Sequence, residues 1–408
     1  MTAKVLMIIP FENLYPPTNG GLQRCFHLLH QLSRFTSVTA IIPDPIERLQ
    51  AAQQNYPALK NATIFSTADS PAIKGFFKLI PANIINAIRY RWLMKTLTRS
   101  ADGWFLKSYK VLKKVLRENK FDVIILENLP LTYYTKWIRK YHKTGKIFFN
   151  AYNVEYVIAQ RNNRGSKESI KKMNEFLQAE SNLYQVVDGI FCCSQVDLDI
   201  FSKLNKNRIA SGYVLPNGVD TKRLFYQYNL SDERMKNILF CGSLDYAPNK
   251  DGLTWFYEKV WPIVSRQLPD RKLFIVGRGG DDDYNELRKD SSVKFIGAVD
   301  DVAPYYAECG VAIAPLLIGS GTRFKVLEAM SIGNPVLTTT IGAEGIQYTN
   351  NETIIIADEP EEYATKLVEL SKNMINTVCI SKKARELVEK EYSWDIIGVS
   401  LSDYLDSL

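Results

Sequence analysis

The stretch VAIAPLLIGSGTRFKVLEAMSIGNPVLTTTIGAEGI, residues 311–346, decides how this chain folds. It starts with the strand-like apolar run 311–314, passes through a loop that carries Gly319 and Gly321, and continues as a helix predicted over residues 323–332. This order brings free backbone N–H groups and the positive end of a helix dipole to one place. Such a place is well suited to binding phosphate.

Two cations lie at the start of the predicted helix. The pattern puts Thr322 at the helix cap and ends the helix at Gly333. At about 100° per residue, Lys325 and Glu328 lie on the polar face, opposite the apolar face that packs. A solvated Lys–Glu pair is the ordinary explanation of such a face. Arg323 and Lys325 follow the glycines so closely, however, that a bound anion explains the whole cluster more simply.

The run GSGTRFKVLEAMSIGNPV, followed by GAEGI, resembles the donor-binding signature of family 4 of the glycosyltransferases, which have the two-domain GT-B fold. The resemblance implies that Gly319, Ser320, Gly321 and Thr322 hold the diphosphate of a nucleotide-sugar and that Glu328 binds the ribose hydroxyls. Many members carry a sugar-binding glutamate where Ser320 stands. The chain is similar to a subgroup that has G-x-G-T-R-x-K at this place.

The composition is typical of a globular chain with two domains. The 408 residues exceed one average core, and 46% apolar residues suffice for two cores. No apolar run approaches the ~18 residues of a membrane span, and the first apolar segment is too short for a signal peptide. The six cysteines lack C-x-x-C spacing and the three histidines are scattered. This pattern predicts reduced thiols in a cytoplasmic protein and no metal cluster.

Strands and helices alternate in both halves, which predicts an α/β fold with parallel sheets. Strands are expected at 4–10, 38–42, 63–65, 123–126, 146–149, 189–193, 238–241, 273–276, 294–296, 311–314, 336–339 and 353–356. With the resemblance, the pattern implies two Rossmann-like domains that face each other across a cleft. Residues 1–225 would form the acceptor-side domain and 226–390 the nucleotide-sugar-binding domain, joined by a polar linker. Residues 391–408 would form a crossover helix that packs back on the first domain.

Three more positions are candidate donor contacts. Gly20 and Gly21 open a helix, where a backbone can approach a phosphate or a sugar, although the pair can equally be a turn. Lys250 follows a loop in which many relatives carry, at the position of Ser243, an arginine that contacts the diphosphate. Here Lys250 or the cations of the 311–346 stretch would supply that positive charge. Val299, in the run GAVDD, matches the family element that lines the base.

Active sites of parallel sheets gather at the carboxyl ends of the strands. Two segments of the first half emerge at such ends: Glu127 with Asn128, and NAYNVEY at residues 150–156. The second segment resembles the family's H-N-V-E-Y element, with Tyr152 in place of the histidine that lies beside the reacting sugar. Glu155 either shares this chemistry or is a charge at a helix N-terminus.

The positive charge is concentrated in one segment. From Lys74 to Arg117 there are eleven basic residues and one acidic residue, so this segment carries +10 while the whole chain carries +7. Aromatic and aliphatic residues interleave with these cations, which favours contact with an anionic membrane surface. Two amphipathic helices with solvated lysines explain the same pattern. A nucleic-acid surface is disfavoured because no nucleic-acid-binding motif accompanies it.

Residues 281–283 contain the triplet D-x-D, which binds metal in the other major glycosyltransferase fold. We interpret it as an acidic helix start, since negative charge is favourable there without a metal. No metal and no cofactor besides the donor substrate are therefore expected.

The resemblance implies a hexosyltransferase-type glycosyltransferase that moves a sugar from a UDP- or GDP-linked donor to a glycan or lipid-linked acceptor. Arg323, Lys325 and Tyr152 are the candidate catalytic residues; fixed cations would stabilise the leaving diphosphate by a few kcal/mol per donor, roughly. Retention of anomeric configuration, independence of metal and a role in cell-surface polysaccharide synthesis are implied as well. The enzyme is expected in the cytoplasm or on the inner face of the cell membrane. Two alternatives stay open: a nucleotide-sugar epimerase, and a non-catalytic membrane-surface or partner-binding protein with a decayed donor site.

Overall fold

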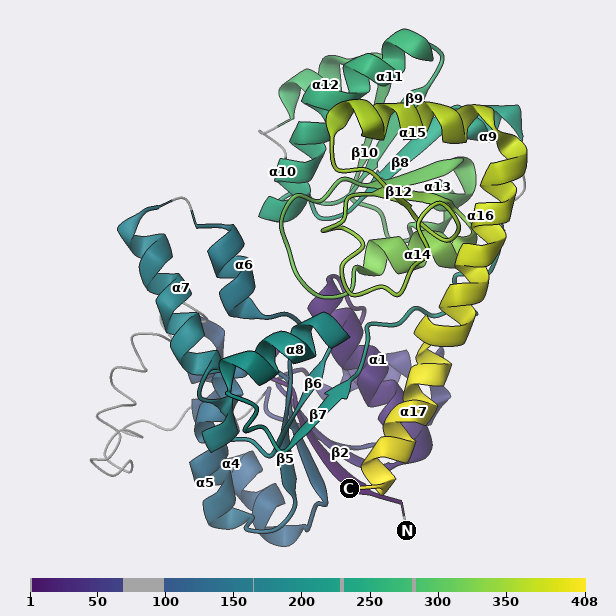
Figure 1. Cartoon of the computed structure of the whole chain (residues 1–408). Coiled ribbons are helices and arrows are strands. Elements are labelled where there is room, and N and C mark those ends of the chain that lie inside the picture. The colour runs from purple at the N-terminus through teal and green to yellow at the C-terminus, as the bar shows by residue number, and fades with distance from the viewer. Residues whose placement is uncertain (1, 69–98, 164, 228–230, 281–283) are drawn as a thin grey trace. The chain divides into compact units, whose positions relative to one another are not determined.

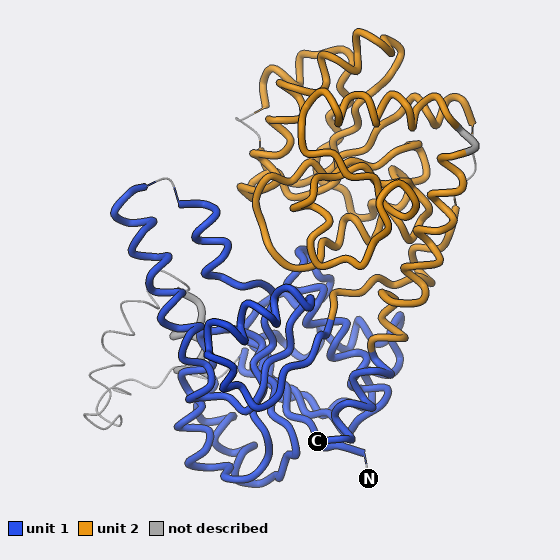
Figure 2. The backbone as a smooth tube through the Cα atoms, viewed as in Figure 1, with its two compact units in different colours: residues 1–215, 398–408 blue, residues 216–397 orange. Residues whose placement is uncertain are grey.

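The chain folds into two compact units. The computed structural model describes residues 2–68, 99–163, 165–227, 231–280 and 284–408. The first unit comprises residues 1–215 and 398–408, and the second comprises residues 216–397 (Figure 1, Figure 2). The division after Leu215 precedes the boundary at residue 225 that the sequence suggested.

The first unit is built on a seven-stranded parallel sheet with the order β3-β2-β1-β4-β5-β6-β7. Its strands are β1 Lys4–Ile8, β2 Ser37–Ile42, β3 Thr63–Ser66, β4 Val123–Leu126, β5 Lys146–Asn150, β6 Gly189–Cys192 and β7 Ser211–Val214. β1 pairs with both β2 and β4, and every residue of β1 after Lys4 is buried. A strand covered on both faces needs such a continuous apolar run rather than an alternating one.

Helices pack on both faces of this sheet. They are α1 Gly20–Phe35, α2 Ile46–Ala52, α4 Arg99–Glu118, α5 Thr135–Tyr141, α6 Glu155–Arg161, α7 Lys167–Glu180 and α8 Gln195–Leu204, with 3-10 turns at Pro57–Asn61, Leu129–Tyr134 and Leu183–Gln185. One face of the sheet shares a buried cluster with α4, α5, α7 and α8; Leu6 and Ile124 belong to it. α1 presents a buried apolar stripe that includes Phe26 and Leu29, which the helical repeat places on one face.

The last residues of the chain complete the first unit. In helix α17, Trp394–Asp406, the ring of Tyr404 stacks on Tyr213 with centroids 4.1 Å apart and meets the edges of Phe148 and Phe191. The backbone N–H of Ala3 donates to Asp406 Oδ1 at 2.9 Å. Both ends of the chain are therefore fastened to the same unit (Figure 2).

The second unit contains a six-stranded parallel sheet with the order β10-β9-β8-β11-β12-β13. The strands are β8 Asn237–Cys241, β9 Lys272–Val276, β10 Val293–Gly297, β11 Val311–Ala314, β12 Val336–Thr338 and β13 Ile355–Ile356. The helices are α9 Asp232–Met235, α10 Ala247–Trp255, α11 Trp261–Gln267, α12 Asn285–Lys289, α13 Ala303–Glu308, α14 Phe324–Ile332, α15 Pro360–Lys372 and α16 Met374–Leu387, with π-helical turns at Phe256–Val260 and Val388–Tyr392. Two separate buried clusters, one on each face, hold the sheet between helices.

The predicted α/β class and its parallel sheets are confirmed, and each predicted strand overlaps an observed one. β7 was not predicted: its sequence SGYV is short and no residue in it is fully buried, so it lacks the apolar run of the inner strands. The acidic triplet at 281–283 lies outside the described residues. So do residues 69–98, which hold most of the basic segment; its last part belongs to α4.

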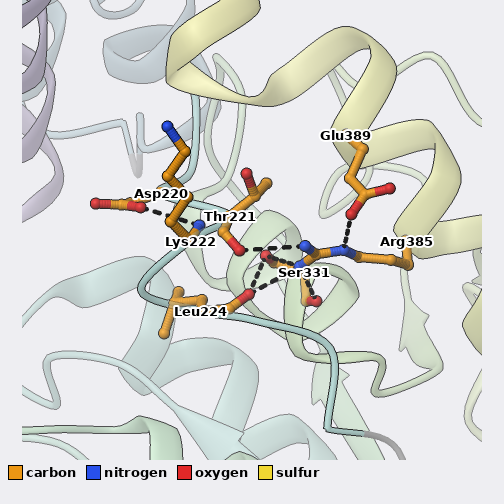
Figure 3. A network of polar contacts seen from close by, with 7 residues as sticks. All are labelled: Asp220, Thr221, Lys222, Leu224, Ser331, Arg385 and Glu389. Atoms are coloured by element: carbon orange, nitrogen blue, oxygen red, sulfur yellow. Dashed lines mark hydrogen bonds and ion pairs between the residues drawn. The ribbon is translucent and has the colours of Figure 1, made fainter.

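A half-buried arginine connects α16 with α14 in the second unit (Figure 3). Arg385 Nη1 donates to the carbonyl oxygens of Leu224 at 2.8 Å and Ser331 at 2.5 Å, and Arg385 Nη2 donates to Thr221 O at 3.1 Å. Its Nε donates to Glu389 at 2.7 Å, and Ser331 Oγ donates to Leu224 O at 2.7 Å. One guanidinium thereby satisfies carbonyl groups from two segments and fixes the end of the helix that the 311–346 stretch forms.

We expect Arg385→Ala to lower the free energy of unfolding by roughly 2–3 kcal/mol, because it removes the guanidinium that donates to the carbonyl groups of Thr221, Leu224 and Ser331. Urea unfolding of the full chain, followed by circular dichroism, measures the change. The control is Lys390→Ala, whose side chain is 81% exposed. Equal unfolding midpoints for the two variants would contradict the role assigned to Arg385.

Candidate active site

The start of α14 differs from the prediction in one respect. Arg323, not Thr322, occupies the cap position, and the Arg323 side chain makes no capping hydrogen bond. Thr322 Oγ1 instead donates to Gly345 O at 3.4 Å, so the predicted threonine cap is wrong. The predicted end is confirmed, because Gly333 has a left-handed backbone with φ of 104°.

The loop before α14 folds around the side chain of Arg323. Gly321 has φ of 76° and Gly319 has φ of 147°, values that residues other than glycine rarely adopt. A Cβ on Gly319 would overlap with Arg323 Nη2, and Arg323 Nη1 donates to Ser320 O. The glycines therefore allow the backbone to approach the guanidinium closely.

Lys325 is half-buried and contacts residues of neighbouring elements. Its Nζ donates to Asn249 Oδ1 at 2.6 Å and lies 4.7 Å from the centroid of the Phe240 ring. Desolvation by this burial lowers the pKa of Lys325 to about 8, an effect that the Cys241 thiol opposes and Arg323 reinforces. The alternative of a fully solvated Lys–Glu pair does not fit this geometry, because Lys325 is half-buried and Glu328 is only 9% exposed.

Loops from the carboxyl ends of several strands meet beside Lys325. Gly242, after β8, donates its N–H to Val276 O at 2.9 Å, and Gly277, after β9, donates to Gly297 O at 2.8 Å. A Cβ on Gly242 would lie 2.6 Å from Lys325 Nζ. The carboxyl ends of the strands thus bring this cation next to the backbone of segments that are distant in sequence, as in other parallel sheets.

Two predicted donor contacts lie on neighbouring elements. Lys250 is half-buried in α10, beside Asn249, whose Nδ2 donates to Ser243 O at 2.8 Å. Val299 packs partly buried against the core cluster that includes Val326 of α14. Asn249 was not predicted, although it stands next to Lys250 in the same helix; its hydrogen bond with Lys325 depends on the tertiary fold.

A cavity of about 850 Å³ opens at the carboxyl ends of the strands of the first unit. The segments that follow β1, β2, β4 and β5 line it together with the start of α1. Both first-half segments that the sequence singled out, the one with Glu127 and the one with Tyr152, reach this cavity.

A cluster of buried polar side chains forms one wall. Glu127 Oε2 accepts hydrogen bonds from Tyr152 OH at 2.7 Å and from Asn150 Nδ2 at 2.8 Å, and Cys25 Sγ lies 2.7 Å from Tyr152 OH. Behind this wall, Arg24 Nη2 donates to Asn150 Oδ1 at 2.7 Å. Burial raises the pKa of Glu127 and raises the pKa of Tyr152 and of Cys25 well above their ordinary values.

Gly21, at the start of α1, lies close to the Tyr152 ring. Asn19 Oδ1 caps α1 by accepting from Leu22 N at 3.0 Å, and a Cβ on Gly21 would lie 3.6 Å from the Tyr152 ring. Sequence reasoning did not assign Glu127, Asn150 or the residues of α1 that contact them. The one available signal was that Glu127 and Asn150 each follow a strand.

Glu155 begins α6 and also lines the cavity. The N–H groups of Glu155 and Tyr156 donate to the carboxyl group of Glu180 at 2.8 and 2.9 Å. Burial raises the pKa of Glu180 to about 8 and also raises the pKa of Glu155. The start of α6 is therefore tied to α7 by a buried acid.

In the parts of the chain that the structure describes, no group of three histidine, cysteine or acidic side chains is placed to hold a metal ion. Within those same parts, no helix combines the length and hydropathy that a membrane crossing needs. All six cysteines are free.

Residues 235–373 match the family described as glycosyl transferases group 1. A Klebsiella pneumoniae protein, described as an uncharacterized 44.6 kDa protein in the cps region, is 29% identical over 95% of this chain and 96% of its own length. The phosphatidyl-myo-inositol mannosyltransferase of Mycolicibacterium smegmatis is 26% identical over 46% of this chain, which covers half of that enzyme (50%).

Two solved structures have the same fold. Sucrose-phosphate synthase from Thermosynechococcus elongatus matches with a TM-score of 0.71 at 16% identity, covering 99% of this chain and 98% of that one. Anabaena HepE, solved in complex with UDP-glucose, matches with a TM-score of 0.64 at 15% identity, covering 100% of both chains. The fold is therefore GT-B, with two α/β units.

We expect iodoacetamide to alkylate Cys379 at least ~10-fold faster than Cys25 at pH 8, since only the thiolate reacts. Cys379 is exposed, whereas Cys25 is buried with a raised pKa. Mass spectrometry of tryptic peptides over time measures both rates. Similar rates at the two thiols would show that Cys25 is not enclosed as described.

Proposed function

We propose, from the premise that this chain is a glycosyltransferase with the GT-B fold and a group 1 domain, that it transfers a sugar from a nucleotide-diphosphate sugar to a saccharide-bearing acceptor. The observation that carries the proposal is the position of Lys325. This half-buried cation donates a hydrogen bond to Asn249 and follows the glycine loop and Arg323 in the chain. All of these residues lie within the matched domain, residues 235–373.

In this proposal the diphosphate binds at the glycine loop. Arg323 and Lys325 supply positive charge, and the backbone N–H groups at the start of α14 supply hydrogen-bond donors. The side chain of the cap residue Arg323 makes no capping hydrogen bond. Glu328 of the same helix, as the family resemblance implies, would accept hydrogen bonds from the ribose hydroxyls. Structural neighbours solved with UDP and UDP-glucose support a nucleotide-sugar as donor.

The chemistry follows from these charges. As the bond between the anomeric carbon and the diphosphate oxygen breaks, negative charge grows on the leaving group, and fixed cations stabilise it without rearranging. The acceptor oxygen bonds to the anomeric carbon and its proton passes to the leaving phosphate. The proposed transfer retains the anomeric configuration, requires no metal and uses Tyr152 beside the reacting sugar.

We place the reaction in the assembly of cell-surface polysaccharide, with a glycan or a lipid-linked glycan as acceptor. The support comes from the relative in a cps region and from the similar phosphatidyl-myo-inositol mannosyltransferase. In this proposal the enzyme works in the cytoplasm or at the inner membrane face, which residues 74–117 would contact.

Replacing both cations tests the donor site. We expect Arg323→Ala/Lys325→Ala to weaken UDP or GDP binding by roughly 100-fold or more, since hydrogen bonds to charged groups contribute about 1.5–3 kcal/mol each. Isothermal titration calorimetry measures the affinity. Lys289→Ala/Lys383→Ala is the matched control, because it also removes two cations of the second unit, whose side chains are 77% and 52% exposed. Unchanged affinity in the double variant would remove the proposed site.

The lowered pKa of Lys325 predicts a pH dependence. The protonated form binds the diphosphate, so affinity should be nearly full at pH 7 and below and should fall roughly tenfold between pH 7 and pH 9. Lys325→Arg stays charged throughout this range and should bind nucleotide with little change. Calorimetry at several pH values compares the two proteins. Parallel pH profiles would contradict the assignment.

A further inference from the structure

The carboxyl group of Glu127 has one oxygen that the fold does not use. Its Oε2 accepts from Tyr152 OH and Asn150 Nδ2, with Cys25 Sγ at 3.6 Å, whereas its Oε1 has no hydrogen-bond partner among the described residues. Glu127 is fully buried, and it lines the cavity of the first unit. An unsatisfied buried acceptor is unfavourable, and a hydroxyl group of a ligand in this cavity would satisfy it.

The surroundings keep this carboxyl group in one orientation. Arg24 donates to Asn150 Oδ1 at 2.7 Å and to Leu215 O at 2.8 Å, which fixes the Asn150 amide with its Nδ2 toward Glu127. The Tyr152 ring lies near Arg24, with the guanidinium carbon 5.8 Å from the ring centroid. A rigid, buried acceptor is what selective recognition of a ligand hydroxyl requires.

Among the described residues, the charge of the lining disfavours an anionic ligand. Four acids of the described part of the chain line the cavity: Glu12, Asp44, Glu127 and Glu155. Within the same described lining Arg48 is the one basic residue; its Nη1 lies 3.6 Å from Asp44 Oδ1, and the oxygens of Asp44 also accept from two backbone N–H groups. A phosphate placed here would face more carboxyl groups than cations, whereas uncharged hydroxyl groups meet acceptors and amides.

The remaining lining suits a sugar ring. Phe11 stands at the cavity with its ring centroid 6.1 Å from that of Tyr152, and it provides an apolar surface for the C–H face of a saccharide. Asn13, Asn19, Asn128 and Asn153 add amide groups that both donate and accept. A hydroxyl group also both donates and accepts, so it can pair with Glu127 Oε1 whether the buried acid carries its proton or not.

We propose that this cavity binds the uncharged terminal sugar of the acceptor and that Glu127 Oε1 forms a hydrogen bond with one of its hydroxyl groups. The inference deepens the proposed function and rests on it, because it names the acceptor class of the same reaction. Glu127 is then a specificity-determining residue that selects a glycan end over a phosphate-bearing acceptor group.

The test uses the full chain and simple sugars as probes. Methyl glycosides of glucose, galactose and mannose, at up to about 100 mM, are compared with glucose 1-phosphate and mannose 6-phosphate by saturation-transfer NMR in the presence of UDP. We expect at least one methyl glycoside to bind and the sugar phosphates to bind more weakly. Glu127→Gln, which swaps one acceptor oxygen for a donor group at nearly the same volume, should weaken glycoside binding at least ~10-fold.

Two controls keep the result interpretable. Glu118→Gln makes the same change of charge at an exposed position of α4 and should bind like the wild type. UDP and GDP affinity, measured on the same samples, reports the donor site separately, and the thermal unfolding curve shows that Glu127→Gln is folded. Glu127→Asp, which keeps the charge but withdraws the carboxyl group, should also bind more weakly.

Three outcomes overturn the inference: no glycoside binds, the sugar phosphates bind more tightly than the glycosides, or folded Glu127→Gln binds glycoside as the wild type does. If the nucleotide still binds in these cases, the proposed function stands and only the acceptor class falls. If glycosides bind as expected but neither nucleotide does, the sugar cavity is supported and the proposed transfer reaction falls.

Discussion

Parallel strands buried on both faces are the constraint on which the rest of this structure depends. Because every strand of a sheet runs the same way, all the connections that leave its carboxyl ends meet at one edge, whatever their separation in sequence. In the first unit this edge brings Cys25, Glu127, Asn150 and Tyr152 into one cluster. In the second unit it brings Lys325 within hydrogen-bond distance of Asn249. Both polar clusters are thus a consequence of the parallel orientation of the strands.

Both clusters hold charged or hydrogen-bonding side chains where little water reaches them. Their desolvation lowers the free energy of unfolding. Desolvation lowers the pKa of Lys325 and raises the pKa of Glu127, so each residue is held in its place against the preference of its charged form for water. Fixed partners, Asn249 in one case and Asn150 with Tyr152 in the other, determine where each group points. Such prepared groups, which a ligand then completes, are typical of functional sites rather than of cores.

The sequence predicted the elements of the fold better than the geometry of its sites. Continuous apolar runs such as 123–126 and 311–314 identified the inner strands, because burial on both faces leaves a strong local signal. The edge strand β7 has no such signal. Helical periodicity placed Lys325 on a polar face, but it could not show that Asn249 and Phe240 of other elements would contact it. The Glu127 cluster joins α1 to segments more than a hundred residues later, which no local pattern reports.

The central claim is that the glycine loop and the start of α14 hold the diphosphate of a nucleotide-sugar. A crystal structure of the full chain with bound UDP or GDP tests this most directly. The account predicts phosphate oxygens within about 3.2 Å of Lys325 Nζ and of backbone N–H groups between Gly319 and Lys325. A nucleotide whose phosphates lie elsewhere while this loop makes no contact with it would contradict the account.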